Sequence, residues 1–453
     1  MSGAEFTGGA ARAGLGRWRT RVRMQTERIR VLGRSRLARD HIMTLGTEFS
    51  VTIASILLLK LAAAYAGPAG FGEFVLGRRL ISFVSLPALC GMALALARSV
   101  AMARGRGRTS EEWMYLDAAV MVTIVTSATA AAALLFGGRI VATVAMGGVA
   151  LTPLARALAP CVAGLIFHGI AYGLLRGRQA MVPANALQAI NIGVVPLAVF
   201  AVPGLSIAEI LCWTGVTQVI IASAAIAVLR ARGPRIAPLP VIWKHAAVEM
   251  LRYGTPRVPG EFMLGAVSAL PVAAAAHFGG AVEAGRIGLG MTILTLFTSV
   301  FAPLGQVLLP DVSSRVAGGE TKGLARGIWA LAAGCIALTA LGVIALELLA
   351  PWILPAVFGP AFSAAVLPAR IIALGALPQV LYVVLRNVLD AIHAAPLNTV
   401  NLFAALVAFG VVLGIGRTEN TIPWAVLASS VVLGALTVWR TRRALRFLSH
   451  IPE

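Results

Sequence analysis

The chain has 453 residues, of which 58% are hydrophobic and only 12% are charged, and its mean hydropathy is +0.87. A soluble globule of this size needs more polar surface than such a composition supplies, so we predict an all-α, polytopic membrane protein. The formal net charge of +20 would also suit nucleic-acid binding, but the charges follow the loops between apolar runs, which argues against a nucleic-acid partner.

Apolar runs of about 20 residues, the length needed to cross about 30 Å of hydrocarbon, recur along the chain. We predict about twelve transmembrane helices, at residues 42–65, 74–98, 115–136, 152–174, 182–203, 206–229, 249–277, 281–309, 326–347, 361–388, 397–415 and 421–439. A shorter apolar stretch at 350–358, interrupted by Pro355, is expected to lie at the membrane interface.

The basic residues alternate with the predicted crossings. They crowd a basic N-terminal segment at 1–41, the loops after even-numbered spans and a basic tail at 440–453, whereas the loops after odd-numbered spans hold little beyond Arg139 and Arg417. The positive-inside rule then places both termini in the cytoplasm of a bacterial inner (plasma) membrane. Segment 1–41 is expected either to lie on anionic membrane lipids or to act only as a topology signal.

The longest break between spans, a cytoplasmic linker at 230–247, divides the helices into an N-terminal six-helix lobe at 42–229 and a C-terminal six-helix lobe at 248–439. A displacement of 213 residues brings the two lobes into register. It superposes Glu48 on Glu261, Ser55 on Ser268, Gly67 on Gly280, Gly72 on Gly285 and Asn185 on Asn398. Because six is even, this is a parallel repeat about the membrane normal, as in transporters that bind substrate between their lobes.

Four segments in the expected order resemble Wzx-type polysaccharide flippases of the MOP superfamily, which also contains lipid II flippases and MATE multidrug exporters. They are Ala-Gly-Pro-Ala-Gly-Phe-Gly-Glu-Phe onward (66–100), Gly-Leu-Leu-Arg-Gly-Arg (173–178), Leu-Arg-Tyr-Gly-Thr-Pro-Arg-Val-Pro-Gly-Glu-Phe (251–262) and Leu-Leu-Pro-Asp-Val-Ser (308–313). The resemblance covers 42–445 and implies two lobes around a central cavity that alternates between inward-open and outward-open states.

The resemblance also implies the cargo, an oligosaccharide linked to undecaprenyl diphosphate. This lipid-linked oligosaccharide would pass from the cytoplasmic to the outer leaflet during polysaccharide biosynthesis, carried by a monomeric transport unit. A polysaccharide polymerase and glycosyltransferases are the expected protein partners. Such a polar, anionic headgroup needs buried cationic side chains along its path, and membranes tolerate these only in a wet cavity or beside a partner.

Lys60, Arg78 and Arg79 lie near the outer ends of the first two predicted spans and are candidates for one cationic, substrate-binding patch. The alternative is that all three snorkel toward the outer headgroups. Arg78 and Arg79 are about 100° apart on a helix, so we do not expect both to enter the same cavity.

In the C-terminal lobe, Arg257 and Arg370 are the candidate substrate contacts. Arg257 lies four residues before Glu261, which allows a local ion pair, and the prolines around it predict a broken helix that lines a cavity. A purely structural kink is the alternative. Arg370 has no obvious carboxylate nearby in the sequence, which makes it a candidate for a diphosphate or an acidic sugar.

Glu48 and Glu261 are repeat mates in apolar spans, and a buried carboxylate there could exchange a proton or bind sodium during transport. Pairing with nearby arginines is the alternative for each. His168 is the one histidine well inside a span, and we attribute it to core packing. The histidines lack metal-ligand spacing, and we expect no metal and no cofactor. The four cysteines lie singly inside apolar runs, where a thiol behaves as a small hydrophobe, so we expect no disulfide.

Four other functions compete with this interpretation. A MATE-type exporter of cationic drugs should have an acidic cavity, whereas basic residues dominate here. Lipid II flippases are close in mechanism but usually carry two additional C-terminal helices. A membrane glycosyltransferase or polymerase needs a sizeable outward loop with carboxylates, and no phosphate loop or catalytic triad is present, so we do not expect an enzyme. The last competitor is a scaffold of the same fold that transports nothing.

Overall fold

The computed structural model describes residues 8–233, 240–317, 323–393 and 396–448. Parts of the predicted N-terminal segment (1–7), linker (234–239) and tail (449–453) lie outside the described residues. Within the described residues the chain is all-α, without a strand. The first half comprises α1 (Gly8–Ala88), α2 (Met92–Gly105), α3 (Thr109–Ala145), α4 (Thr152–Gly177), α5 (Met181–Gln188), a π-helix (Ala189–Val194), α6 (Val195–Phe200) and α7 (Ile207–Ala231).

The second half comprises α8 (Pro240–Gly254), α9 (Val258–Ser299), α10 (Ala302–Ala317), α11 (Leu324–Phe358), α12 (Val366–Leu374), α13 (Ala376–Ile392), α14 (Leu397–Gly416) and α15 (Ile422–Leu448). Short 3₁₀ helices at Val149–Leu151, Thr255–Arg257, Pro360–Ala365 and Glu419–Thr421 join several of them. The stretch 350–358, predicted to be a separate interfacial segment, instead continues α11 through Pro351 and Pro355.

Nine helices in the described part of the chain are long and apolar enough to cross a membrane, or ten if the bent pair α12 and α13 forms one span. The protein is therefore a multi-pass membrane protein. Two of these segments, Met43–Ala88 with 46 residues and Trp243–Ser299 with 57, are each long enough for two crossings at about 1.5 Å per residue. The number twelve itself stays a prediction.

Both long segments break at a glycine. Gly67 in α1 has φ 63° and ψ −169°, and Gly280 in α9 has φ 73° and ψ −166°. Positive φ is comfortable only for glycine, since it has no Cβ. The two breaks lie 213 residues apart and share one unusual conformation, which confirms the predicted register of the repeat at this point.

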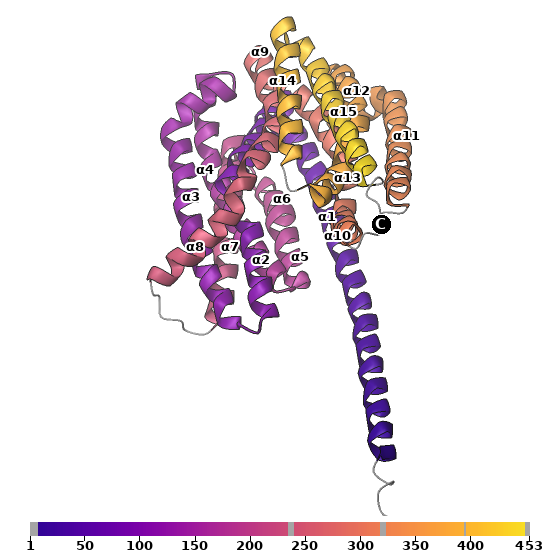
Figure 1. Ribbon diagram of the computed structural model, residues 1–453. Coiled ribbons are helices and arrows are strands. Elements are labelled where there is room, and N and C mark those ends of the chain that lie inside the picture. Colours follow the sequence, from indigo (N-terminus) through magenta and orange to yellow (C-terminus); the bar gives the residue numbers. More distant parts are fainter. Residues whose placement is uncertain (1–7, 234–239, 318–322, 394–395, 449–453) are drawn as a thin grey trace, which may run out of the picture.

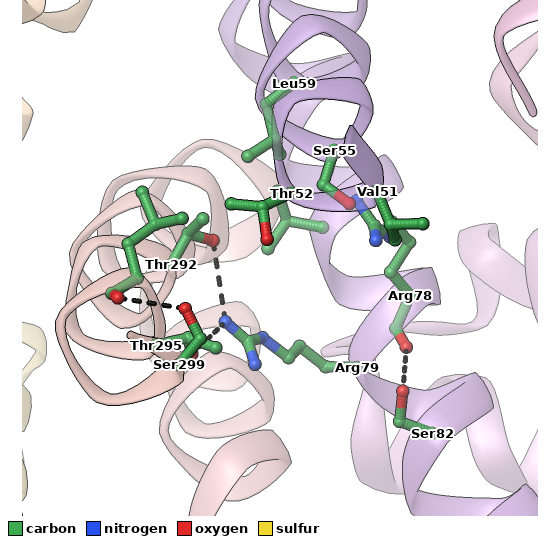
Figure 2. A pocket seen from close by; sticks show the side chains of 12 residues that line it. Val51, Thr52, Ser55, Leu59, Arg78, Arg79, Ser82, Thr292, Thr295 and Ser299 are labelled. Atoms are coloured by element: carbon green, nitrogen blue, oxygen red, sulfur yellow. Dashed lines mark hydrogen bonds between the residues drawn. The ribbon is translucent and has the colours of Figure 1, made fainter. Parts of the chain in front are cut away.

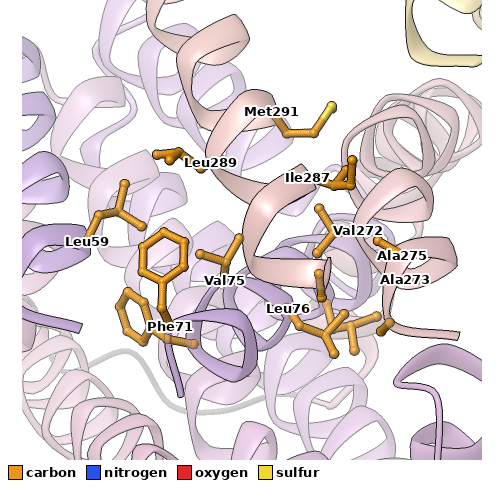
Figure 3. Packing of buried hydrophobic residues seen from close by; sticks show 14 of the residues in the cluster. Leu59, Phe71, Val75, Leu76, Val272, Ala273, Ala275, Ile287, Leu289 and Met291 are labelled. Carbon is orange, nitrogen blue, oxygen red and sulfur yellow. The ribbon is translucent and has the colours of Figure 1, made fainter. Parts of the chain in front are cut away.

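The helices form two lobes (Figure 1). Helices α2–α8 group on one side and α10–α15 on the other, while α1 and α9 pass between them and contact each other extensively. The hydrophobic core continues across this junction, where Phe71, Val75 and Leu76 of α1 pack with Ile287 and Leu289 of α9 (Figure 3). The start of α1 and the ends of α2, α7 and α15 point to the same side of the molecule (Figure 1).

Near the two glycine breaks the lobes meet backbone to backbone. A Cβ added to Gly72 of α1 would lie 1.6 Å from the carbonyl oxygen of Ala281 in α9, and one added to Gly147 would lie 2.1 Å from that of Ala276. Phe71, which is fully buried, packs edge-on against the ring of Phe362 in the opposite lobe at 5.0 Å. These contacts hold the two lobes together near the glycine breaks of α1 and α9.

A charge cluster joins four helices at the opposite, basic end of the N-terminal lobe. The buried carboxylate of Glu112 on α3 binds Arg104 of α2 and Arg178, which directly follows α4, each at 3.0 Å. Asp117 of α3 binds Arg230 of α7 at 2.8 Å. These bonds tie α2, α3, α4 and α7 into one unit at the end where α2 and α7 terminate.

Candidate functional site

A central cavity of about 200 Å³ lies between α1 and α9 (Figure 2). Two arginines, six hydroxyl-bearing side chains and four aliphatic ones line it: Arg78, Arg79, Thr52, Ser55, Ser82, Thr292, Thr295, Ser299, Val51, Leu59, Val75 and Leu296. Both α1 crossings contribute, as does the second half of α9. The cavity therefore lies at the junction of the two lobes.

The side chain of Arg79 extends from α1 to α9. Its Nη1 donates a hydrogen bond to Ser268 Oγ at 2.7 Å, and its Nη2 lies 3.5 Å from both Thr292 Oγ1 and Thr295 Oγ1. Thr292 and Thr295 are three residues apart and so share one face of α9. All of these partners are neutral hydroxyls, so they orient the guanidinium without neutralising its charge.

Arg78 lines the same cavity but turns toward the N-terminal lobe, with its guanidinium 5.7 Å from the ring of Phe74. It also borders a chamber of about 190 Å³ inside that lobe, which Phe200 and Gln218 help to line. Arg79 in turn borders a chamber of about 260 Å³ in the C-terminal lobe. The expectation that Arg78 and Arg79 do not both enter one cavity is wrong. Their side chains leave the helix in different directions, but they are long enough that both reach the central cavity.

The three cavities around these arginines contain no carboxylate among their described lining residues. In the described part of the chain, neither Arg78 nor Arg79 has a carboxylate within 4 Å. A guanidinium at membrane depth without a counter-ion is costly unless water or an anionic ligand solvates it. Chemically, the cavity fits an anion that carries hydrogen-bonding groups.

Lys60 does not belong to this site. It is exposed on α1 and does not line the central cavity, so the predicted patch of three cations is reduced to Arg78 and Arg79. The snorkelling alternative fits Lys60 but not Arg79, whose side chain is directed into the lobe junction.

Arg257 and Glu261 do not form the expected ion pair among the described contacts. The helix break predicted here is present, since the 3₁₀ turn Thr255–Arg257 separates α8 from α9. The Arg257 guanidinium lies 4.0 Å from the centre of the Tyr253 ring and donates to the Tyr253 carbonyl at 2.5 Å, while Arg98 approaches the same ring at 4.5 Å. Neither Arg257 nor Glu261 lines the central cavity.

Arg370 has a partner, contrary to the reasoning from sequence. Its Nε binds Glu347 Oε2 at 2.5 Å. Glu347 lies 23 residues earlier on α11, so the pair forms between helices and gives no local signal. Glu48 is exposed on the first crossing of α1, equivalent to the position of Glu261 on α9, and does not line the cavity either. An ion-coupling role for the two glutamates stays a prediction.

The sequence reasoning missed the hydroxyl partners of Arg79. Ser268 is the repeat mate of Ser55, but the repeat alone assigns it no role. Thr292, Thr295 and Thr298 recur every three residues in an apolar span, which places them on one helix face. That spacing was the available signal.

A comparison with protein-family profiles and with curated protein sequences finds no match. Solved structures do match. An inward-facing MATE multidrug-resistance transporter of the MOP superfamily superposes with a TM-score of 0.76 at 13% identity, covering 91% of this chain and 100% of the other. The outward-facing form described for such a transporter gives 0.63 at 12% identity, with coverage of 91% and 97%.

A MOP superfamily transporter from Pyrococcus furiosus, described as having a binding pocket of reverse polarity that suggests a different function, gives a TM-score of 0.59 at 12% identity, with coverage of 92% and 96%. At such low identity these comparisons establish the fold alone. The chain has the two-lobed fold of the MATE transporters of the MOP superfamily, in an arrangement more similar to the inward-facing than to the outward-facing form.

Proposed function

We propose that the protein is a transporter that binds an anionic headgroup between its lobes and moves it across the membrane by alternating access. The observation that carries this proposal is the pair Arg78 and Arg79 in a central cavity without a carboxylate among its described lining residues. Solved structures of the same fold are described as transporters, which supports the general class.

The position of the cavity supports alternating access. Two pairs of repeat mates touch across the lobe junction: Gly72 with Gly285, and Arg79 with Thr292 at 3.5 Å. A residue that meets its own repeat mate lies on the axis that relates the repeats, so both contacts mark the pseudo-twofold axis. Arg79 lies seven residues beyond Gly72, about 10 Å along the helix. A ligand on Arg79 would thus stay at the pivot while the lobes rock around it.

The glycine contact at Gly72 is then the closed outer gate of an inward-facing state. Opening toward the other side requires α1 and α9 to separate there, and the backbone contact has few side chains to repack. The similarity to the inward-facing form of a MATE transporter supports this assignment.

For the cargo, we favour undecaprenyl-diphosphate-linked oligosaccharide, flipped from the cytoplasmic to the outer leaflet of a bacterial inner membrane with both termini in the cytoplasm. Two guanidinium groups suit a diphosphate, and six hydroxyls suit the sugars beside it. The segments that resemble Wzx-type flippases and the basic loops support the same assignment. The lobes at 42–229 and 248–439 are the proposed moving units.

A MATE-type exporter of cationic drugs is the second candidate, because structural neighbours are described as MATE multidrug-resistance transporters. A lipophilic cation needs carboxylates or aromatic faces in its site. The central cavity has neither among its described lining residues and offers two guanidinium groups instead. The pocket of reverse polarity described for the Pyrococcus furiosus transporter is a precedent for such a difference within this fold.

A binding competition separates the two candidates. Purified protein in lipid nanodiscs is titrated with undecaprenyl diphosphate, with uncharged undecaprenol and with the cationic dye ethidium. We expect saturable binding of the diphosphate lipid, much weaker binding of undecaprenol and no competition by ethidium. Saturable ethidium binding that is insensitive to the diphosphate lipid would instead favour the exporter.

A further inference from the structure

A second polar feature is buried in the N-terminal lobe, away from the arginines. His168 of α4 and Asn191 of the π-helix expose only 6% and 0% of their surface. His168 Nε2 lies 2.8 Å from Gln188 Oε1, and His168 Nδ1 lies 3.3 Å from Asn191 Nδ2. Gln218 of α7 completes the network. Its side-chain Nε2 donates to the main-chain carbonyl of Asn191 at 2.9 Å, and its main-chain carbonyl accepts from Asn191 Nδ2 at 3.4 Å.

With the amides in these orientations, the contacts fit one protonation state. Nε2 faces an amide oxygen, to which an Nε2–H group would donate, and Nδ1 faces an amide NH₂, from which it would accept. This pattern corresponds to a neutral imidazole in the Nε2–H form. Asn191 Oδ1 is buried and has no hydrogen-bond partner among the described residues, which is rare and costly for a polar atom inside a protein.

A second proton on His168 would reverse one contact. Nδ1 would become a donor and would meet the NH₂ group of Asn191, which is also a donor. A half-turn of the Asn191 amide removes this conflict, because it brings the unpaired Oδ1 to Nδ1. The same turn breaks the bond from Asn191 Nδ2 to the Gln218 carbonyl. The network thus has two arrangements that differ by one proton and one amide orientation.

The network departs from the repeat. At a displacement of 213 residues, His168, Asn191 and Gln218 correspond to Leu381, Ala404 and Val431, although the buried Asn185 nearby keeps its counterpart Asn398. Residues 402–407, which correspond to the π-helix, form part of the regular helix α14. The fold therefore does not require these groups, and π-helical turns inside α-helices often mark functional positions.

The charged and titratable neighbours of His168 are few in the described lobe. Tyr172, one turn further along α4, stacks on the imidazole with ring centres 5.7 Å apart. Arg176 of α4 and Glu48 of α1 interact electrostatically with Tyr172, and Cys90 packs in the same hydrophobic cluster. Among the described residues, the hydrogen-bond partners of the imidazole are two neutral amides, Gln188 of α5 and Asn191 of the π-helix.

We propose that His168 is a proton-binding site whose protonation turns the Asn191 amide and thereby changes the bond between the π-helix and Gln218. Gln218 lines the N-lobe chamber that Arg78 also borders. Proton binding at His168 is thus linked to the wall of that chamber through Asn191 and Gln218, which are hydrogen-bonded across the contact between the π-helix and α7. The proposal does not depend on the identity of the cargo.

The test is an NMR titration of full-length protein in lipid bilayers with ¹⁵N-labelled histidine. The His168 signals are assigned by their loss in His168→Gln, or by elimination through the other single histidine variants if that variant does not fold. We expect the neutral Nε2–H form at high pH and reversible conversion to the doubly protonated form as the pH is lowered from about 8 to about 4. His277→Gln, which removes an exposed histidine, is the matched control and should leave the His168 titration unchanged.

Variants of Asn191 test the amide turn. Asn191→Leu removes Oδ1, the atom that would accept a hydrogen bond from protonated His168. Its loss should lower the titration midpoint of His168 by about one pH unit, which corresponds to the free energy of about one hydrogen bond. Asn191→Asp supplies an oxygen without a turn and should raise the midpoint. The proposal is overturned if His168 stays neutral across this range while exposed histidines titrate, or if both Asn191 variants leave its midpoint unchanged.

Discussion

Removing the guanidinium of Arg79 should weaken binding of a diphosphate lipid far more than it weakens the fold. Within the described residues, the hydrogen bonds of Arg79 all go to hydroxyls of α9, and the shortest is that to Ser268 at 2.7 Å. Removing the guanidinium therefore leaves no partner charge unpaired. Each charge-assisted hydrogen bond to an anion contributes roughly 1.5–3 kcal/mol. Arg79→Ala should therefore raise the dissociation constant for undecaprenyl diphosphate by about tenfold to a hundredfold.

The assay is a binding titration in nanodiscs with three variants. Arg79→Ala gives the full loss, and Arg79→Lys should be milder if a point charge suffices, whereas an equal loss would indicate bidentate contact with phosphate. Lys60→Ala is the matched control, since Lys60 is an exposed cation on the same helix. It should bind the lipid like the wild type.

Two results would refute this reasoning. If Arg79→Ala binds the diphosphate lipid with unchanged affinity, the central cavity does not hold the headgroup. If Lys60→Ala loses as much affinity as Arg79→Ala, the effect reflects the net charge of the protein and not the cavity.

Three further perturbations follow from the structure. Gly72→Ala places a Cβ against the backbone of α9 and should favour the outward-open state. Ser299 ends α9 on the cytoplasmic side of the Gly280 break, so Ser299→Cys should then be labelled several-fold more slowly by a membrane-impermeant reagent in inside-out vesicles; Gly137→Ala, at a site open to space, should not change this rate. Glu112→Gln leaves two arginines without their carboxylate and should cost about 2–3 kcal/mol, measured as a lower melting temperature; an unchanged melting temperature would argue against the charge cluster. Arg370→Ala breaks the ion pair with Glu347 of α11 and should lower the melting temperature, while the affinity for the diphosphate lipid stays normal. A loss of affinity would indicate that Arg370 contacts the substrate.

The sequence predicted the architecture because its signals are local and repeated. Apolar runs identify helices that must satisfy their own backbone in lipid. The 213-residue displacement pairs Gly67 with Gly280, and these two glycines share one unusual conformation in the structure. The number of helices was harder to predict from the sequence. Helices α1 and α9 continue through Gly67 and Gly280, and a hydropathy pattern does not show where a long helix changes direction.

The candidate site was predicted only in part, since its partners come from different helices. Arg78 and Arg79 stood out as cations in an apolar span, but the sequence did not show that Lys60 points elsewhere. The contact between Arg370 and Glu347 crosses two helices, and so does that between Arg79 and Ser268. Such pairings depend on how helices pack, which spacing along one helix does not encode.

His168 illustrates the same limit. A lone histidine in an apolar span suggested core packing, and it is indeed buried. Its partners on α5 and the π-helix, Gln188 and Asn191, lie 20 and 23 residues away. Only the packing of these segments against α4 shows that the histidine belongs to a hydrogen-bonded network.

Transbilayer movement of the lipid-linked glycan tests the central claim most directly. The protein is reconstituted into vesicles with undecaprenyl-diphosphate-linked oligosaccharide that carries a fluorophore on its sugar, and a membrane-impermeant reductant is added outside. The account predicts that wild-type protein exposes the fluorophore of both leaflets to the reductant, whereas the Arg78→Ala, Arg79→Ala double variant exposes only the outer-leaflet fraction. Wild-type vesicles that behave like protein-free ones, or a double variant that flips at the wild-type rate, would contradict it.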